Sequence, residues 1–497
     1  MSETSQEDPA DTTTTSPPRE LAPRLAVITL CAAGIVVSLM QSIIMPLIPQ
    51  LPSILNSSPD STTWAVTITL LTGAAVTPIS GRLGDMYGKR LVLLVNMGLV
   101  AAGSLVCAGS SSLAPFLAGR ALQGLGFGTI ALGISVMRDI VPPRHLGSSI
   151  GAMSASLGIG GALGLPFAAV IAAQINWQTM FLACAAVALA AGLGIASTIP
   201  ESPTRTGGRF DIVGAVGLVT MLSCLLLPLS KGATWGWATP LTLGLFTAFA
   251  FLAIGWSAFE RRRSSPLIDL SVATERSVLL TNIASFATGF AFYSVQLIPI
   301  QLLMAPTASP NGMGLDMVSA SLVLAPSGLI MFAFSRVSAQ ITDKFGPRIS
   351  LATGGMVLAA GYIVLLGALT GPWNVGWPAM LIVSCFIGAG LGIAYSAMPA
   401  LIMRAVRPEQ TGEANGVNAL MRVVGTSASS ATVGMILTWS TINVATSDGG
   451  VTLPSQSGYL WAGAISLVAC IVAAAVALMI PTRRAPASMA PASRVDS

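Results

Sequence analysis

The residues of this chain that could do chemistry are few, and they form no catalytic cluster. The single histidine, His145, stands next to Arg144. The six cysteines show no CxxC or Cys/His spacing, which argues against a metal site. The chain also lacks the glycine-rich nucleotide-binding motif of proteins that use ATP directly. We therefore expect a protein that is not an enzyme and that needs no metal or cofactor.

Two arginines, Arg120 and Arg422, fall inside long apolar stretches. A guanidinium there is costly unless it faces a polar cavity or extends to the headgroup layer. Gln123 lies one helical turn from Arg120, and Asn418 lies one turn from Arg422, so we favour a polar cavity for both. Further polar residues could line the same path or bond to a neighbouring helix, and both readings stay open. These are Gln41, Tyr293, Gln296, Gln301 and Tyr395.

Acidic residues avoid the apolar stretches. We place five aspartates at the edges of the apolar stretches and two glutamates in the loop near residue 410. A path without carboxylates should be neutral to positive. It should favour neutral, zwitterionic or anionic amphipathic molecules over strongly cationic ones. The acidic residues concerned are Asp85, Asp139, Asp211, Asp316, Asp343, Glu409 and Glu413.

Fourteen apolar stretches must position these residues. A membrane-spanning helix takes about 20 apolar residues, and the composition agrees, with 9% charged residues, 53% hydrophobic residues and a mean hydropathy of +0.78. We therefore predict an all-α membrane protein. The predicted spans are Leu25–Ile48, Thr62–Ser80, Leu91–Gly109, Leu113–Met137, Leu146–Ala172, Gln178–Ile199, Ile212–Leu229, Pro240–Phe259, Val278–Met304, Val318–Ile341, Ser350–Thr370, Gly376–Met403, Gly416–Ser440 and Tyr459–Ile480.

Basic residues fix the expected orientation. Of the 24 lysines and arginines, all except Lys231, Arg120 and Arg422 lie in alternate loops, in the two tails or, as Arg336 does, in the last turns of the span before such a loop. Cytoplasmic loops of membrane proteins carry an excess of lysine and arginine, so both termini should be cytoplasmic. The net charge of +5 then reflects topology and is no sign of nucleic-acid binding. A chain rich in Ala, Gly and Arg with few lysines suggests a bacterial inner membrane.

The chain contains an internal repeat with an offset near 260 residues. The segment GRLGDMYGKR, from Gly81 to Arg90, closes the second span, and AQITDKFGPR, from Ala339 to Arg348, closes the tenth. A duplicated membrane unit is typical of transporters with a central site between the halves. We predict disordered tails at 1–24 and 481–497, six-helix bundles at 25–199 and 278–480, and two inserted helices with their linkers at 200–277.

Several motifs resemble those of the major facilitator superfamily. GRLGDMYGKR is similar to its loop motif, and FLAGRALQGLG, starting at Phe116, is similar to its fourth-helix motif. The pattern of Gly151, Gly160, Gly164 and Pro166 resembles the antiporter motif of its exporters. With fourteen spans, the chain resembles the drug:proton antiporter family. The resemblance implies two pseudo-symmetric six-helix bundles plus two inserted central helices.

The same resemblance implies a latch on the cytoplasmic side. Asp85 would face the positive N-terminus of the thirteenth helix, near Gly412–Gly416. Gly81 and Gly88 would allow a tight turn, and Arg90 would hold Asp85 or a neighbouring carboxylate. The alternative is that these charges only anchor the loop in the headgroup layer. The second copy of the latch comprises Asp343, Gly346 and Arg348.

Two departures from the family pattern affect the expected mechanism. Met40 stands where relatives carry a carboxylate, and Leu165 separates Gly164 from Pro166. The glycines of the antiporter motif should allow close helix packing, and Pro166 could add a hinge. Packing without a hinge is the alternative.

By resemblance, the function is secondary active export of a small amphipathic molecule by alternating access, driven by the proton gradient. Uptake or symport of a metabolite is the alternative. The expected partners are the substrate and the lipid bilayer, with no nucleic acid, and we expect a monomer.

Overall fold

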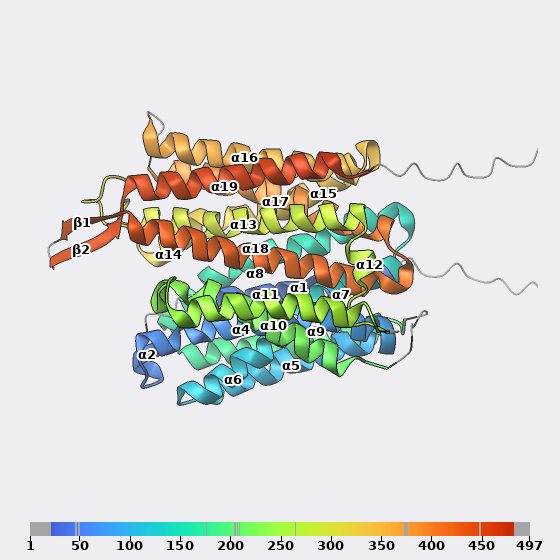
Figure 1. The fold of residues 1–497 in the computed structure, drawn as a ribbon. Coiled ribbons are helices and arrows are strands. Elements are labelled where there is room, and N and C mark those ends of the chain that lie inside the picture. Colours follow the sequence, from blue (N-terminus) through green and yellow to red (C-terminus); the bar gives the residue numbers. More distant parts are fainter. Residues whose placement is uncertain are drawn as a thin grey trace, which may run out of the picture.

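The structure is a computed structural model that describes residues 21–44, 47, 50–174, 176–202, 205, 207, 209–263, 265–371, 376–446 and 449–481. Almost all of these residues are helical, and the helices run along one common axis (Figure 1). The predicted all-α class is therefore confirmed. The predicted tails lie almost wholly outside the described residues.

Helices from the first and second halves of the chain lie on opposite sides of the bundle (Figure 1). The first half contains α1 (Leu21–Ser42), α2 (Leu51–Ile54), α3 (Pro59–Thr62), α4 (Trp64–Tyr87), α5 (Lys89–Gly109), α6 (Leu113–Gly124), the 3-10 turn η2 (Leu125–Phe127), α7 (Gly128–Ile140), α8 (Pro143–Gln174) and α9 (Trp177–Thr198). The inserted helices are α10 (Ile212–Trp235) and α11 (Pro240–Glu260).

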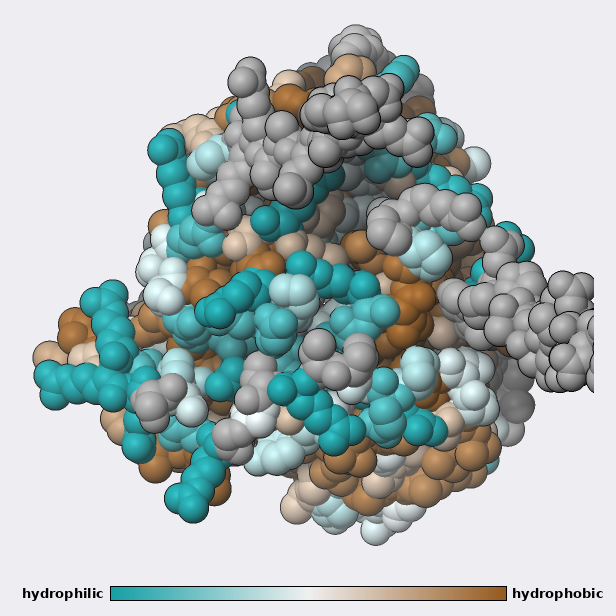
Figure 2. All heavy atoms as spheres, turned by 90° about the vertical axis from the view of Figure 1, so that its right-hand side faces the viewer, coloured by the Kyte–Doolittle hydropathy of each residue, from teal (hydrophilic) through white to brown (hydrophobic). Residues whose placement is uncertain are grey.

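The second half contains α12 (Leu270–Ala273), α13 (Arg276–Met304), α14 (Met317–Leu324), α15 (Pro326–Phe345), α16 (Pro347–Thr370), α17 (Trp377–Ala405), the 3-10 turn η3 (Pro408–Gln410), α18 (Thr411–Trp439) and α19 (Gln456–Met479). An antiparallel hairpin of β1 (Thr441–Thr446) and β2 (Gly449–Pro454) joins α18 to α19. We call this end of the bundle the hairpin end and the opposite end the Asp85 end. Figure 2 shows the Asp85 end, where many hydrophilic side chains gather.

Thirteen helical segments of the described residues are long and apolar enough to cross a membrane. The expected fifth span falls in α8, which is not among them and several of whose side chains lie outside the described part. The count of fourteen therefore stays a prediction. Other helix boundaries differ from the predicted ones. The first helix, α1, ends at Ser42 and not at Ile48. Pro46 lies a few residues further on, and the residue before a proline disfavours the helical conformation. The sequence analysis also missed the hairpin.

Two glycines make the sharp turns that close the repeated motifs. Gly88 has a φ of 115° between α4 and α5, and Gly346 has a φ of 88° between α15 and α16. A residue with a Cβ adopts such angles rarely, so the turn selects glycine at both positions. The repeat seen in the sequence is thus present as matching backbone turns.

The hydrophobic interior divides into separate clusters. One is built from residues 26–199 with Met403, and a second from residues 284–480. A third places Leu218 and Leu222 of α10 against Ala74 of α4 and Leu420 of α18. The inserted helix α10 therefore packs where α4 and α18 meet. The proposed domain boundaries themselves stay a prediction.

Glycines of α8 allow it to approach α1 closely. A Cβ on Gly160 would lie 2.6 Å from the carbonyl oxygen of Ile35 and 2.6 Å from Cβ of Ser38. A Cβ on Gly164 would lie 2.7 Å from Cβ of Ser42. Gly160 and Gly164 of the antiporter motif are thus needed for packing inside the first half.

We predict that Gly160→Ala lowers the stability of the folded protein by about 1–3 kcal/mol, because the added methyl group overfills this contact. Gly98→Ala is the control: Gly98 is exposed on α5 with no atom within 4 Å of its ideal Cβ. It should be neutral or slightly stabilising, because alanine favours helix over glycine by up to about 1 kcal/mol. Thermal unfolding of detergent-purified protein measures both, and equal shifts would contradict the packing argument.

Candidate gate and transport path

The two halves meet at the Asp85 end through a carboxylate and a helix N-terminus. Asp85 lies near the end of α4 and is 2% exposed. Its Oδ2 accepts a hydrogen bond of 2.9 Å from the backbone N–H of Glu413, in the first turn of α18. The first N–H groups of a helix lack partners within the helix, and the residue before it, Gln410, makes no side-chain cap. Asp85 therefore caps α18 from the other half of the protein.

Glycines on both helices make this contact possible. A Cβ on Gly81 would lie 2.3 Å from the carbonyl oxygen of Gly412, and a Cβ on Gly412 would lie 2.7 Å from Oδ1 of Asp85. One turn further along α18, a Cβ on Gly416 would lie 2.8 Å from Cα of Pro78. The backbones of α4 and α18 thus touch along this segment, which larger residues would hold apart.

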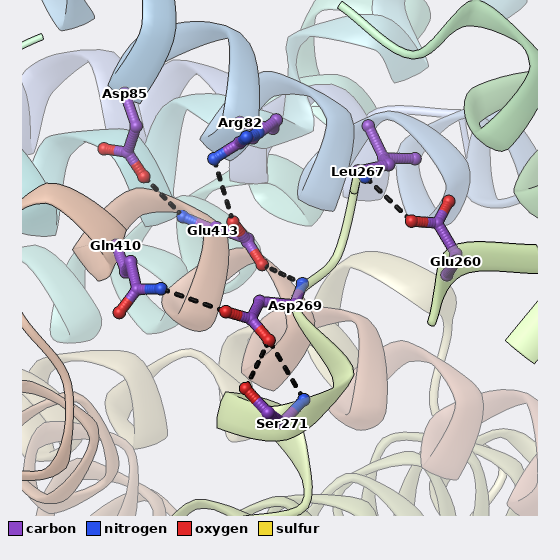
Figure 3. Close-up of polar contacts among 8 residues, drawn as sticks. All are labelled: Arg82, Asp85, Glu260, Leu267, Asp269, Ser271, Gln410 and Glu413. Atoms are coloured by element: carbon purple, nitrogen blue, oxygen red, sulfur yellow. Dashed lines mark hydrogen bonds and ion pairs between the residues drawn. The ribbon is translucent and has the colours of Figure 1, made fainter. Parts of the chain in front are cut away.

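Glu413 connects three parts of the chain (Figure 3). Its side chain is buried, and Oε2 lies 3.4 Å from Nη1 of Arg82, on α4. Oε1 accepts a hydrogen bond from the backbone N–H of Asp269, which caps α12 and in turn accepts a bond of 3.2 Å from Gln410. The linker that follows the inserted helices is therefore bound to the contact between the halves. The expectation that Glu413 lies in a loop is wrong, because it belongs to the first turn of α18.

Arg90 does not contact Asp85. Its Nη1 lies 3.4 Å from Oε1 of Glu201, and Nη2 donates to the carbonyl oxygen of Ala196. Arg90 therefore ties the α4–α5 turn to the end of α9, within the first half. Of the two partners expected for it, the neighbouring carboxylate is the one present.

Two basic residues at the Asp85 end were not singled out from the sequence: Arg138 bonds to the second half, and Lys89 is paired within the first half. Arg138, near the end of α7, donates to Oγ1 of Thr411, at the start of α18. Lys89 is 1% exposed and forms a salt bridge of 2.8 Å with Asp139. In the sequence, the basic loops that contain Arg138 and Lys89 indicated the edge of the membrane, but they did not indicate which residues these two side chains would contact.

The second copy of the motif makes a looser contact. Asp343 is exposed, and its Oδ1 lies 4.0 Å from the position that a Cβ on Gly147 of α8 would take. Gly151 is closer, since its Cβ would lie 3.0 Å from the carbonyl oxygen of Ser335 on α15. Arg348 donates a bond of 3.3 Å to the carbonyl oxygen of Ile480 and so stays within its own half.

Arg120 is sealed inside the first half. It is 1% exposed, Nη1 donates to Oε1 of Gln123 at 2.6 Å and to the carbonyl oxygen of Met40 at 3.1 Å, and Nε donates to the carbonyl oxygen of Ala65 at 3.1 Å. Gln123 also donates to Oγ of Ser104 at 2.8 Å. The expectation that Arg120 faces an open cavity is wrong for this conformation, because backbone carbonyls of α1 and α4 occupy its donors.

Arg422 has a different environment, between α13, α17 and α18 of the second half. It is partly exposed, and its Nη1 donates to Oδ1 of Asn418 at 2.9 Å. Its guanidinium carbon lies 5.1 Å from the centre of the Tyr395 ring. Tyr395 is buried and makes an edge contact with Phe292 on α13.

The other polar residues proposed for the transport path differ in their exposure and contacts. Gln296 is exposed, and Gln41 and Tyr293 are partly exposed. Gln301 accepts a bond of 3.4 Å from the hydroxyl of Tyr459, so it contacts a neighbouring helix. The side chain of Pro166 lies outside the described residues.

Comparisons with known proteins agree with this architecture. The profile of the Major Facilitator Superfamily matches residues 30–430. Multidrug resistance protein 3 of Bacillus subtilis is 25% identical over 368 residues, 74% of this chain and 70% of that protein. The tetracenomycin C resistance and export protein of Streptomyces glaucescens is 27% identical over 418 residues, 82% of this chain and 74% of that protein. The proton:xylose symporter XylE superposes with a TM-score of 0.62 at 15% identity, over 91% of this chain and 95% of XylE, which shows a shared fold.

We predict that Asp85→Asn opens the contact between α4 and α18. A charge at a helix N-terminus contributes about 0.3–1 kcal/mol, up to about 2, which is roughly a 2- to 30-fold shift in the equilibrium at 1.4 kcal/mol per factor of ten. Labelling of a Val417→Cys reporter in a cysteine-free background measures the opening, since Val417 packs between α4 and α10. The exposed counterpart provides the control: Asp343→Asn should change labelling by less than about twofold. Equal effects of both variants on labelling would contradict the inference that Asp85 holds the halves together more strongly than Asp343 does.

We also predict that Glu413→Ala frees the segment around α12. The substitution removes the acceptor of the Asp269 N–H and the partner of Arg82, so the Asp269 amide should exchange with solvent about tenfold faster. Hydrogen-exchange mass spectrometry of the peptide 265–275 measures this. Glu409→Ala is the matched control, because Glu409 makes no hydrogen bond or salt bridge within the described chain. An unchanged exchange rate of this peptide in Glu413→Ala would refute the inference that Glu413 holds the α12 segment in place.

Proposed function

The chain belongs to the major facilitator superfamily, and we propose that it exports small amphipathic molecules of the antibiotic type by alternating access, in exchange for protons. The observation that carries the proposal is the capping of α18 by Asp85. This contact joins the halves at the Asp85 end of the bundle, and a central path would open toward that end when it breaks. Rocking of two repeats about a central site is the usual mechanism of such folds.

We propose that the Asp85 end faces the cytoplasm of a bacterial cell, with both termini on that side. The basic loops support this orientation, because Arg82, Lys89 and Arg138 all lie at this end. A monomer is sufficient for the mechanism, since both halves of the gate come from one chain.

The names of two relatives favour export, since one is a multidrug resistance protein and the other a tetracenomycin C resistance and export protein. Uptake or symport is the alternative, and the proton:xylose symporter has the same fold. Family membership also favours a transporter over a membrane enzyme or a channel.

Proton exchange needs a titratable group that changes its environment during the cycle. Position 40, near the end of α1, is a methionine. The described carboxylates that are buried between the halves are Asp85 and Glu413, which are 2% and 4% exposed. We propose that coupling uses these two groups, because opening of the gate would bring them into contact with water.

The test is transport into everted membrane vesicles with an imposed pH gradient and a panel of neutral, zwitterionic, anionic and cationic compounds. We expect saturable, gradient-driven accumulation that collapses with a protonophore. Ethidium should be a poor substrate, because the path carries the cation of Arg422 and no described carboxylate near its middle. Asp85→Asn should reduce the rate severalfold more than Asp343→Asn does. Gradient-driven accumulation in intact cells instead would establish uptake.

A further inference from the structure

Each of the two intramembrane arginines has a side-chain amide one helical turn away in the sequence, but the N–H donors of the two differ in how far neighbouring groups already occupy them. Arg120 donates to one side-chain oxygen and two backbone carbonyls and is 1% exposed. Arg422 donates to one side-chain oxygen and is partly exposed. A guanidinium has five N–H donors, so most of those on Arg422 remain available for a ligand.

Asn418, the acceptor of Arg422 among the described residues, is held in place by hydrogen bonds to α13. Asn418 donates through Nδ2 to Oδ1 of Asn282 at 3.0 Å and to Oγ of Ser285 at 2.7 Å, both on α13. These bonds direct Oδ1 of Asn418 toward Arg422. The Tyr395 ring packs on the guanidinium from α17, at 5.1 Å. Arg422 is thus fixed by two other helices before any ligand arrives, which reduces the entropy cost of binding.

The position of this cluster is near the middle of the bundle. Arg422 lies eleven residues after the start of α18 and Tyr395 ten residues before the end of α17, which is about 15–17 Å from the Asp85 end at 1.5 Å per residue. That is about half of a 30 Å hydrocarbon core. Among the described residues no carboxylate forms a salt bridge with Arg422, and Glu413 is the nearest acidic residue on its helix, about 13 Å away along the axis.

An uncompensated cation at this depth is costly, and it is expected to have a function. A guanidinium binds carboxylates through two parallel hydrogen bonds. The aromatic pair of Phe292 and Tyr395 beside it provides ring edges and faces for a planar group. The combination fits a ligand in which an anionic carboxylate is attached to an aromatic ring.

We propose that Arg422, oriented by Asn418 and Tyr395, binds the carboxylate of planar aromatic substrates, whereas Arg120 has a structural role. This inference rests on the proposed transport function for its meaning in the cell. Binding to the purified protein tests it separately, so that an Arg422-dependent ligand would stand even if export failed.

The experiment compares 2-naphthoate with its uncharged analogue 2-naphthamide, measured by calorimetry on the purified protein in nanodiscs. The wild type should bind naphthoate roughly tenfold more tightly than naphthamide. Arg422→Gln should abolish that preference and leave naphthamide binding unchanged. Arg422→Lys should recover it only in part, because lysine lacks the planar fork of donors.

Two further variants keep the test decisive if Arg422→Gln does not fold. Asn418→Asp places a carboxylate beside Arg422, which should compete with the ligand and weaken naphthoate binding by roughly tenfold. Arg120→Lys should lower the melting temperature without changing the preference between the two ligands. The proposal is overturned if neither ligand binds, if both bind equally to the wild type, or if the Arg422 variants weaken both ligands alike.

Discussion

The structure depends on one constraint: a charge inside an apolar helix bundle must find a partner in the protein, since lipid offers none. Asp85 meets it by capping α18, and Glu413 meets it through Arg82 and the Asp269 amide. Because these partners come from different parts of the chain, satisfying each charge also joins those parts. The gate is in this sense a consequence of burying carboxylates where two halves meet.

The same constraint explains how the inserted helices are attached. At the hairpin end α10 bonds to the start of α4: Lys231 bonds to Thr63, the residue before this helix, and Ser230 bonds to Thr67 at 3.0 Å. Toward α18 it packs apolar side chains, such as Leu218 and Leu222, in the shared cluster. The linker after α11 is bound instead to Glu413 of the second half. The insertion is therefore fastened to both halves, at opposite ends of the bundle.

The aspartates of the two copies of the repeat differ in their burial and in their contacts. The first places a buried carboxylate on a helix N-terminus, and the second leaves Asp343 exposed near Gly147. The turns themselves match, with Gly88 and Gly346 both at positive φ. Similar glycine turns thus follow one buried and one exposed carboxylate, so Asp85 should contribute more than Asp343 to holding the two halves together.

The sequence alone determined the helical class, most spans and the turn at Gly88, because hydrophobic length and the steric freedom of glycine are local properties. It also pointed to Asp85 through the repeated motif. It could not separate Arg120 from Arg422, since each has a polar neighbour one turn away. Only the tertiary structure decided between them, because the partners that seal Arg120 include backbone carbonyls of Met40 and Ala65, which every residue type possesses and no sequence pattern marks.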